Sequence, residues 1–500
     1  MSRRMLVAAL LATVLLTGCA ANPPTLDEQP LDDTLAPAGV SLPESDLPLP
    51  LPEGELSRTE AVHQALWRNP RMQRAYAALQ LDAADVVEAS QFSNPRLSLG
   101  LLRPEGGGGN KASLGLSWGI AGLLMRRSRL DIAEAHWQAR RLQLAESLLA
   151  LASDTERAWF AVVEAEQAAW VHELEHRTAD LAYRLGQRFH EAGNMNDLDL
   201  ARLRVNAAEA SVAQEDAERQ VRLSRTRLAA LMGLPEHAAE WDLPTQLPLP
   251  ADALDQDLLI SEALDNRLDL RSLDMALEGL TEGVALARRF RWLGDIEPGI
   301  AFEREKDGTR LYGASLALGL PLFHQNQAAQ SRADAQLVDG EARRESLRQG
   351  IIRDVRQLAL EREAHASRFA QFRNELLPAH EQVIRFTQER VNFMFDDVFD
   401  LLASKQDELA AWGRAVDELG AYWQTQARLA HAVGTDLPGV DDDAVFDTSG
   451  LEYPPGAHAE MHGDHGHGGE DHEDHPDDHD HDHDHDHDHD HDHDGHGGHH

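Results

Sequence analysis

Residues 113–120 read Ser-Leu-Gly-Leu-Ser-Trp-Gly-Ile, and residues 313–320 read Gly-Ala-Ser-Leu-Ala-Leu-Gly-Leu. In both stretches large apolar side chains alternate with small or polar ones, which is the period-two pattern of a β-strand with one apolar face. A shorter alternating run and a turn precede each stretch, over residues 97–110 in the first case and 300–309 in the second. The sequence therefore predicts two β-hairpins.

Very long stretches rich in Ala, Leu, Glu, Arg and Gln follow the two hairpins. Residues 123–192 contain no proline, and residues 325–392 contain only Pro378. A helix of about 70 residues would extend roughly 100 Å and could not bury its apolar positions alone, which predicts coiled-coil packing. Each stretch breaks near residue 194 or 395 and then returns, so we expect antiparallel helical hairpins with tips at these two places.

The chain is internally duplicated. Three short landmarks recur in the same order at offsets of 198 to 201 residues, which predicts two copies of one unit. They are the pairs Ala65-Leu66 and Ala263-Leu264, Leu198-Asp199-Leu200 and Phe399-Asp400-Leu401, and Arg227-Leu228-Ala229 and Arg428-Leu429-Ala430. A helix opens the first copy, because Ser57 and Glu60 have the spacing of a capping box. The predicted boundaries are 57–233 for repeat 1, 234–255 for the segment between the repeats, and 256–434 for repeat 2.

The N-terminus has the pattern of an export signal. A positively charged start precedes the 12-residue apolar segment Met5–Leu16, which is too short to span a bilayer. Leu16-Thr17-Gly18-Cys19 follows, and it is similar to a bacterial lipobox, in which the cysteine is lipidated; an ordinary signal peptide is the alternative. Cys19 is the only cysteine. We predict a signal peptide at 1–18, lipidation of Cys19, and an extended proline-rich linker at 19–56.

The one-sided strands suit either a soluble, half-buried hairpin or the wall of a transmembrane β-barrel. Two equivalent hairpins in an exported, lipid-anchored chain favour the barrel. Four strands cannot close a barrel, and open strand edges cannot face lipid, so this interpretation requires oligomerisation.

Composition excludes several classes of function. The chain has 500 residues and a formal net charge of −40, so no basic footprint exists for nucleic acid. One cysteine rules out an intrachain disulfide and a cysteine-based zinc module. No phosphate-binding glycine loop, nucleophile elbow or HExxH motif occurs, and we predict no enzymatic activity.

These features together resemble the outer-membrane efflux (TolC-like) family over residues 57–434. The residues that carry the resemblance are Asn69-Pro70, Asn94-Pro95, Ala192-Gly193-Asn194 and Leu320-Pro321-Leu322-Phe323. The stretch from Asn392 to Leu402 looks like the second tip of the heavy-metal efflux branch (CzcC- and CusC-like).

The resemblance implies a mainly α-helical fold with a small β part that assembles as a homotrimer. It implies a 12-stranded outer-membrane β-barrel above a periplasmic α-helical tunnel, with no required cofactor. It also implies two partners, a periplasmic adaptor (membrane fusion) protein and an inner-membrane pump of the RND type, and localisation in the outer membrane of a bacterium.

Acidic residues gather at both predicted tips. Family members often close the tunnel with acidic rings, so these residues are candidates for a gate; adaptor docking and solvated tip charge are the alternatives. The candidates are Asp396, Asp397 and Asp400 at the second tip, and Asp197 and Asp199 at the first. Met394 stands where the first tip has Gly193, which predicts a different turn geometry at the second tip.

The C-terminal tail points to metal. A linker at 435–457 precedes residues 458–500, which hold 17 histidines, 16 acidic residues and no Lys or Arg, a composition typical of disorder. Imidazole suits Zn, Cu, Ni and Co, and binding should weaken below a histidine pKa of about 6.5. A solubilising acidic spacer is the alternative. The candidate ligands are His458, His462, His465, His467, His472, His475, His479, His481, His483, His485, His487, His489, His491, His493, His496, His499 and His500.

The leading hypothesis is an outer-membrane channel subunit of a tripartite system that exports heavy-metal cations. One alternative is the same channel for drugs or organic toxicants, with the tail as a metal store. Another is a periplasmic metal-binding lipoprotein without a pore.

Overall fold

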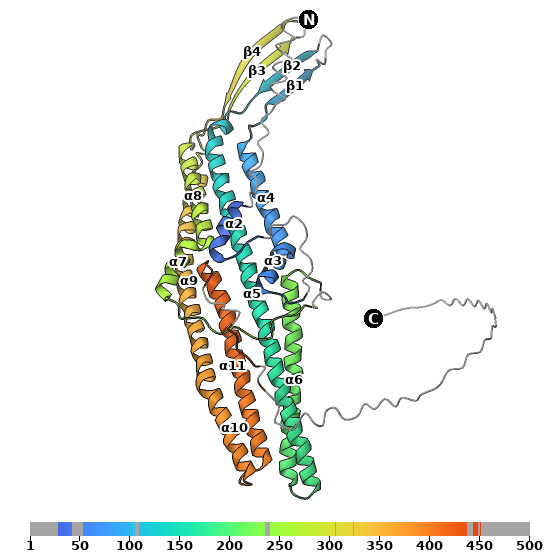
Figure 1. Ribbon diagram of the computed structural model, residues 1–500. Coiled ribbons are helices and arrows are strands. Elements are labelled where there is room, and N and C mark those ends of the chain that lie inside the picture. Colours follow the sequence, from blue (N-terminus) through green and yellow to red (C-terminus); the bar gives the residue numbers. More distant parts are fainter. Residues whose placement is uncertain are drawn as a thin grey trace, which may run out of the picture. The chain divides into compact units, whose positions relative to one another are not determined.

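The fold was analysed in a computed structural model (Figure 1). The structure describes residues 29–42, 54–103, 105, 110–235, 241–305, 307–323, 325–437, 444–448 and 451. The chain divides into two units, residues 1–451 and 452–500, and all described residues belong to the first.

The described residues confirm the duplicated order of elements. Repeat 1 contains α3 (Arg58–Arg68), α4 (Pro70–Ser90), β1 (Arg96–Leu102), β2 (Lys111–Ser117), α5 (Ala121–Glu191) and α6 (Asp197–Leu231). Repeat 2 contains α7 (Gln256–Asn266), α8 (Leu268–Arg289), β3 (Ile296–Arg304), β4 (Arg310–Leu318), α9 (Gln327–Gln371), the π-helix η3 (Phe372–Leu376), α10 (Leu377–Asn392) and α11 (Val398–Val433). The predicted helical hairpins are α5–α6 and α10–α11.

Local sequence explains where the first helices begin and end. The Ser57 hydroxyl accepts from the Glu60 amide, and the Glu60 carboxylate accepts from the Ser57 amide, so the predicted capping box is confirmed. Asn69 ends α3, and its side-chain oxygen accepts from the Arg71 amide to cap α4, which begins at Pro70. Proline suits the first turn because the amide it lacks would have no helical partner.

The helices form one continuous layer at two levels (Figure 1). Near the sheet the order of neighbours is α4, α5, α8 and α9; near the tips it is α6, α5, α11 and α10. Helix α5 has 71 residues and runs through both levels. Repeat 1 therefore supplies one flank of the layer and repeat 2 supplies the other.

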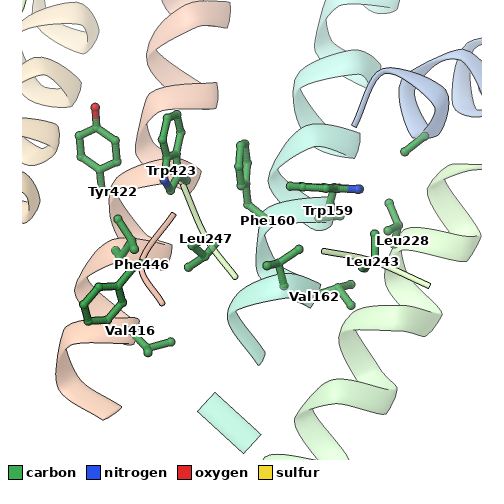
Figure 2. Close-up of a cluster of buried hydrophobic side chains, with 14 of the residues drawn as sticks. Trp159, Phe160, Val162, Leu228, Leu243, Leu247, Val416, Tyr422, Trp423 and Phe446 are labelled. Carbon is green, nitrogen blue, oxygen red and sulfur yellow. The ribbon is translucent and has the colours of Figure 1, made fainter. Parts of the chain in front are cut away.

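The main core lies where the two levels meet (Figure 2). Phe160 of α5 stacks on Trp423 of α11 with ring centroids 5.2 Å apart. The Trp159 indole donates to the Leu56 carbonyl at 3.0 Å, and the Trp423 indole donates to the Pro248 carbonyl at 2.7 Å. Trp159 thus attaches the segment that leads into repeat 1, and Trp423 attaches the segment that connects the repeats. Burial of a large apolar side chain contributes about 1.5–3 kcal/mol to the free energy of unfolding.

Residues 29–38 differ from the predicted extended linker. They form helix α2 (Gln29–Leu35) and the 3₁₀ helix η1 (Ala36–Ala38). Leu31 and Leu35 are fully buried against the first repeat, and the Asp436 amide donates to the Pro37 carbonyl at 2.9 Å. Leu31 and Leu35 have helical spacing, but the surrounding prolines and acidic residues made the helix hard to predict.

The second long helical stretch is interrupted, whereas α5 is not. A π-helical turn at Phe372–Leu376 separates α9 from α10, directly before Pro378. Proline has no amide to continue the helical ladder, and π-bulges are a common way to absorb such a gap.

Candidate functional site

The four strands form one antiparallel sheet in the order β1-β2-β3-β4. Its register aligns the apolar positions: Leu99 pairs with Leu114, Leu114 with Phe302, and Phe302 with Tyr312. One face is therefore apolar across all four strands and is not covered by the chain itself. Leu99 and Tyr312 are 75% and 78% exposed.

The opposite face carries small and polar side chains. Ser98, Gly115 and Ala301 lie side by side across β1, β2 and β3. The charged residues of this face pair with one another, with Lys111 Nζ 2.9 Å from a Glu303 carboxylate oxygen. A sheet with one apolar face and one small, polar face suits a wall between lipid and water.

Both helical tips have the same backbone turn. Gly193 has a φ of 76° and Met394 has a φ of 60°, both in the left-handed region. The Asn194 amide donates to the Phe189 carbonyl at 2.8 Å, and the Phe395 amide donates to the Arg390 carbonyl at 2.9 Å. The expectation of a different turn geometry at the second tip is therefore wrong: helix C-capping imposes the left-handed residue, and Met394 adopts it despite its side chain.

The acidic residues of the second tip have partners inside their own hairpin. Arg390 forms a two-pronged ion pair with Asp396, which lowers the pKa of that carboxyl. Asp397 and Asp400 form a reciprocal capping box at the start of α11, in which each carboxylate accepts from the other's amide. These contacts fix the turn. Their place in an assembled pore stays a prediction.

The first tip is capped differently. Asn196 accepts from the Asp199 amide at 2.9 Å, and Asp199 pairs with Arg202 at 3.1 Å. Asp197 is nearly fully exposed, with one carboxylate oxygen 3.5 Å from His190 Nε2. The two tips contact each other, because the Phe189 and Phe399 rings lie 5.5 Å apart in an edge arrangement.

The sequence-based choice of acidic candidates did not include the apolar residues at the end of the second tip. Phe393, Met394 and Phe395 are 73%, 93% and 74% exposed, whereas the first tip has Gly193 and Asn194 in the turn. Three consecutive exposed apolar residues are unusual on a free surface and indicate contact with a partner.

The flanks of the helical layer also carry unpartnered apolar stripes. On α6, Leu198, Val205 and Val212 follow a seven-residue spacing and are 56–60% exposed. Leu376 of η3 and Val383 of α10 show the same spacing on the other flank and are 43% and 50% exposed. The heptad spacing was present in the sequence and could have identified these positions.

A partly buried acid, Glu164, lies between α5 and α11. Glu164 accepts from the Gln424 amide group at 2.6 Å, and burial raises the pKa of Glu164 to about 7. Asp417 adds to this shift, and its own pKa is raised by burial. Glu164 also packs where a side chain on Gly420 would collide with it, so Gly420 makes room for this carboxyl.

Within the described residues, no helix combines the length and the apolar character needed to cross a bilayer. Among the side chains that the structure places, no group of three or more His, Cys, Asp or Glu residues could hold a metal ion. Cys19 and the tail histidines, from His458 to His500, lie outside the described residues.

Residues 61–234 match the family model described as outer membrane efflux protein. Repeat 1 is therefore similar to outer membrane efflux proteins over nearly its whole length. No curated protein matches the chain.

Solved structures of outer-membrane channels share the fold of this chain. The Campylobacter jejuni CmeC outer membrane channel superposes with a TM-score of 0.64 at 14% identity, over 79% of this chain and 94% of that one. CusC gives a TM-score of 0.61 at 14% identity, over 79% of this chain and 99% of that one. The open state of the Neisseria gonorrhoeae MtrE channel gives 0.62 at 18% identity, over 75% and 88%.

The fold is that of outer-membrane channels. The predicted fold class is confirmed in its mainly helical character, its duplication and its two hairpins. At these identities the solved structures show the fold alone.

Proposed function

We propose that the chain is the outer-membrane channel subunit of a tripartite efflux system that exports heavy-metal cations from the periplasm to the exterior. The observation that carries the channel assignment is the four-stranded sheet, with its continuous apolar face, joined to long paired helices. An apolar face of this extent is unstable in water and suits the hydrocarbon of a bilayer.

The flanks support assembly as a ring. At every level repeat 1 supplies one edge (β1, α4 and α6) and repeat 2 supplies the other (β4, α9 and α10). Pairing the first edge of one copy with the second edge of the next is a heterologous contact, which closes into a ring when the rotation allows it. Three copies supply the twelve strands expected of the family and leave no open edge in lipid.

The tips support docking of a periplasmic adaptor. The second tip presents Phe393, Met394 and Phe395 to solvent on a turn that the Arg390–Asp396 ion pair holds in place. An adaptor that buries these three side chains would couple the tunnel to an inner-membrane RND pump, the partner expected from the family. On this proposal the chain catalyses no reaction and forms a conduit for the exported cations.

The metal substrate rests on the sequence. The tail from His458 to His500 supplies many overlapping sets of imidazole and carboxylate ligands for Zn, Cu, Ni or Co, and the second tip resembles the heavy-metal branch. Lipidation of Cys19 would hold the N-terminus at the membrane, and a periplasmic tail could collect metal near the tunnel.

The substrate is tested in a strain that lacks this gene, grown with Zn, Cu, Co, Ni, Cd and Ag salts and with antibiotics and detergents. We expect selective metal sensitivity that the full-length gene rescues. A gene in which all 17 tail histidines are replaced by Gln serves as the matched variant, because it keeps the 16 acids and the length. Sensitivity confined to organic compounds would replace the metal substrate by a drug-like one.

The pore and the tail are tested separately on purified protein. Single-channel conductance in planar bilayers is expected for both the full chain and a chain without residues 458–500. Calorimetry at pH 7.5 should show that the truncated chain loses most of the bound metal. Absence of any conductance would favour a non-pore metal-binding lipoprotein, and equal metal uptake by both forms would eliminate the tail as the binding site.

A further inference from the structure

A cluster of arginines lies where the helices meet the sheet. Residues 121–130 and 283–294 contain six arginines and no acidic residue, in a chain with a net charge of −40. We name this set the arginine collar: Arg126, Arg127, Arg129, Arg288, Arg289 and Arg291. The first three begin α5 directly after β2, and the last three end α8 directly before β3.

The fold brings the two halves of the collar to one level. The Ile120 amide donates to the Ile296 carbonyl at 2.9 Å, so α5 starts beside the point where α8 gives way to β3. Helices α5 and α8 pack antiparallel, with Gly279 directly against Ala135. Counting nine residues along each helix from this contact places Arg288 level with Arg126.

Most collar arginines have no carboxylate partner among the described residues. Arg288 pairs with Asp334, but Arg127 and Arg289 have no ion pair among the described residues and are exposed. Arg126 donates to the Ser90 carbonyl and lies over the Phe92 ring, and Arg291 lies over the Trp292 ring. Three exposed arginines of α6, namely Arg202, Arg219 and Arg222, pair with acids three or four residues away.

Exposed apolar side chains surround the collar and continue the apolar face of the sheet. Trp118 extends the alternation of β2, and Leu320 extends that of β4. Together with their neighbours they are 39–96% exposed. The set comprises Phe92, Trp118, Leu123, Leu124, Trp292, Leu320, Leu322 and Phe323.

We propose that the arginine collar is a binding site for the headgroups of anionic phospholipids in the periplasmic leaflet of the outer membrane. This inference rests on the proposed channel function, because it requires the sheet to span the bilayer. Aromatic side chains prefer the membrane interface, and guanidinium groups pair with phosphate through two parallel hydrogen bonds. The phosphate groups of the lipid would take the place of the carboxylate partners that Arg127 and Arg289 lack among the described residues.

The test uses the full-length oligomer in mixed micelles with equal amounts of dioleoyl phosphatidylglycerol and dioleoyl phosphatidylethanolamine. Native mass spectrometry then counts the lipids that stay bound. We expect phosphatidylglycerol to be enriched, and the triple variant Arg127→Gln, Arg289→Gln, Arg291→Gln to reduce that enrichment by roughly 100-fold, since each of the three basic residues near a membrane surface contributes about 1 kcal/mol.

The matched control changes three exposed, ion-paired arginines on α6: Arg202→Gln, Arg219→Gln and Arg222→Gln. It should keep the enrichment. If the collar variant does not assemble, the unmodified chain decides the question, because enrichment must fall when salt rises from about 0.1 M to about 1 M and the Debye length shrinks from about 10 Å to about 3 Å.

Equal retention of both lipids by an oligomer that inserts into vesicles would overturn the collar proposal and leave the channel standing. Equal loss of enrichment in the collar variant and the control would also overturn it, because net charge alone would then explain the effect. Failure of the chain to insert into vesicles of either lipid would overturn both the collar and the channel.

Discussion

If the apolar face of the sheet contacts lipid, replacing Leu99 by arginine should strongly destabilise the assembled protein. Leu99 occupies the centre of β1, pairs with Leu114 and is 75% exposed in the single chain. If that face met water, Leu99→Arg would change stability by no more than about 0.5 kcal/mol. If it meets lipid, an arginine near the bilayer midplane costs about 2–4 kcal/mol per chain, or about 6–12 kcal/mol for a trimer.

The assay compares Leu99→Arg with Ser98→Arg. The two positions are adjacent in β1 and point to opposite faces of the sheet, so the same arginine is placed once toward lipid and once toward the interior. Trimers in the outer-membrane fraction are measured by electrophoresis of unheated samples, and their resistance is measured by urea titration. We expect Leu99→Arg to deplete trimers strongly, and Ser98→Arg to keep them while lowering cation conductance.

Two results would refute this reasoning. Equal trimer yield and equal urea midpoints for Leu99→Arg and the unmodified chain would mean that the apolar face does not contact lipid. Loss of trimers in Ser98→Arg alone would mean that the faces are inverted. Far-ultraviolet circular dichroism controls for the helical part, which packs below the sheet and should be unchanged in both variants.

Four further predictions concern the helical part. Val205→Asp, in the exposed heptad stripe of α6, should leave the fold of the single chain intact but lower the trimer fraction at least about ten-fold in light scattering, because it buries an unpaired charge between copies. Glu164 has a folded pKa of about 7, above its unfolded value, so its favourable contribution is complete below about pH 4.5 and is lost as the pH rises through 7. Denaturant titrations should therefore show stability that falls by about 2 kcal/mol over this range in the unmodified chain and a flatter profile in Glu164→Gln. Arg362→Met should lower the free energy of unfolding by about 3 kcal/mol, because three of the four neutral acceptors that the buried guanidinium holds would be left without a donor; an unchanged melting temperature would contradict this. Met394→Gly should stabilise the second tip by about 1 kcal/mol by relieving a left-handed backbone, which is visible as slower amide hydrogen exchange in the turn; faster exchange would show that the methionine side chain itself supports the tip.

The elements set by short-range chemistry could be predicted from the sequence. Period-two alternation located all four strands to within a few residues, and the absence of proline predicted α5, which is unbroken from Ala121 to Glu191. The capping box at Ser57 predicted the start of repeat 1. In these cases the signal lies within one element and does not depend on its neighbours.

Features set by packing were missed or misjudged. Helix α2 escaped prediction because Leu31 and Leu35 are only two apolar positions among prolines and acids, and the surface that buries them is formed by repeat 1. The pairing of β2 with β3, which unites the two hairpins into one sheet, depends on residues almost 200 positions apart. The turn at Met394 was judged from its residue type, whereas the end of the helix dictates its conformation.

The candidate tip residues illustrate the difference between composition and function. Acidic residues at the second tip suggested a pore ring, which stays a prediction; in the single chain Asp396, Asp397 and Asp400 each hold the turn together. Phe393, Met394 and Phe395 beside them are 73–93% exposed and have no such partner role in the turn. A sequence shows which charges are present, but their availability depends on hydrogen bonds that only the folded turn reveals.

Duplication followed by divergence gives the proposed ring a specific symmetry. The two tips share one backbone turn, so six helical hairpins in a trimer would end in nearly equivalent geometry. Their surfaces differ, because Gly193 and Asn194 alternate around the ring with the apolar Met394 and Phe395. An adaptor docked on the proposed trimer would meet three apolar and three polar tips. Apolar contacts at the second tip would fix the register of docking, and the first tip, with Gly193 and Asn194 in its turn, could tolerate a different contact as the tunnel opens.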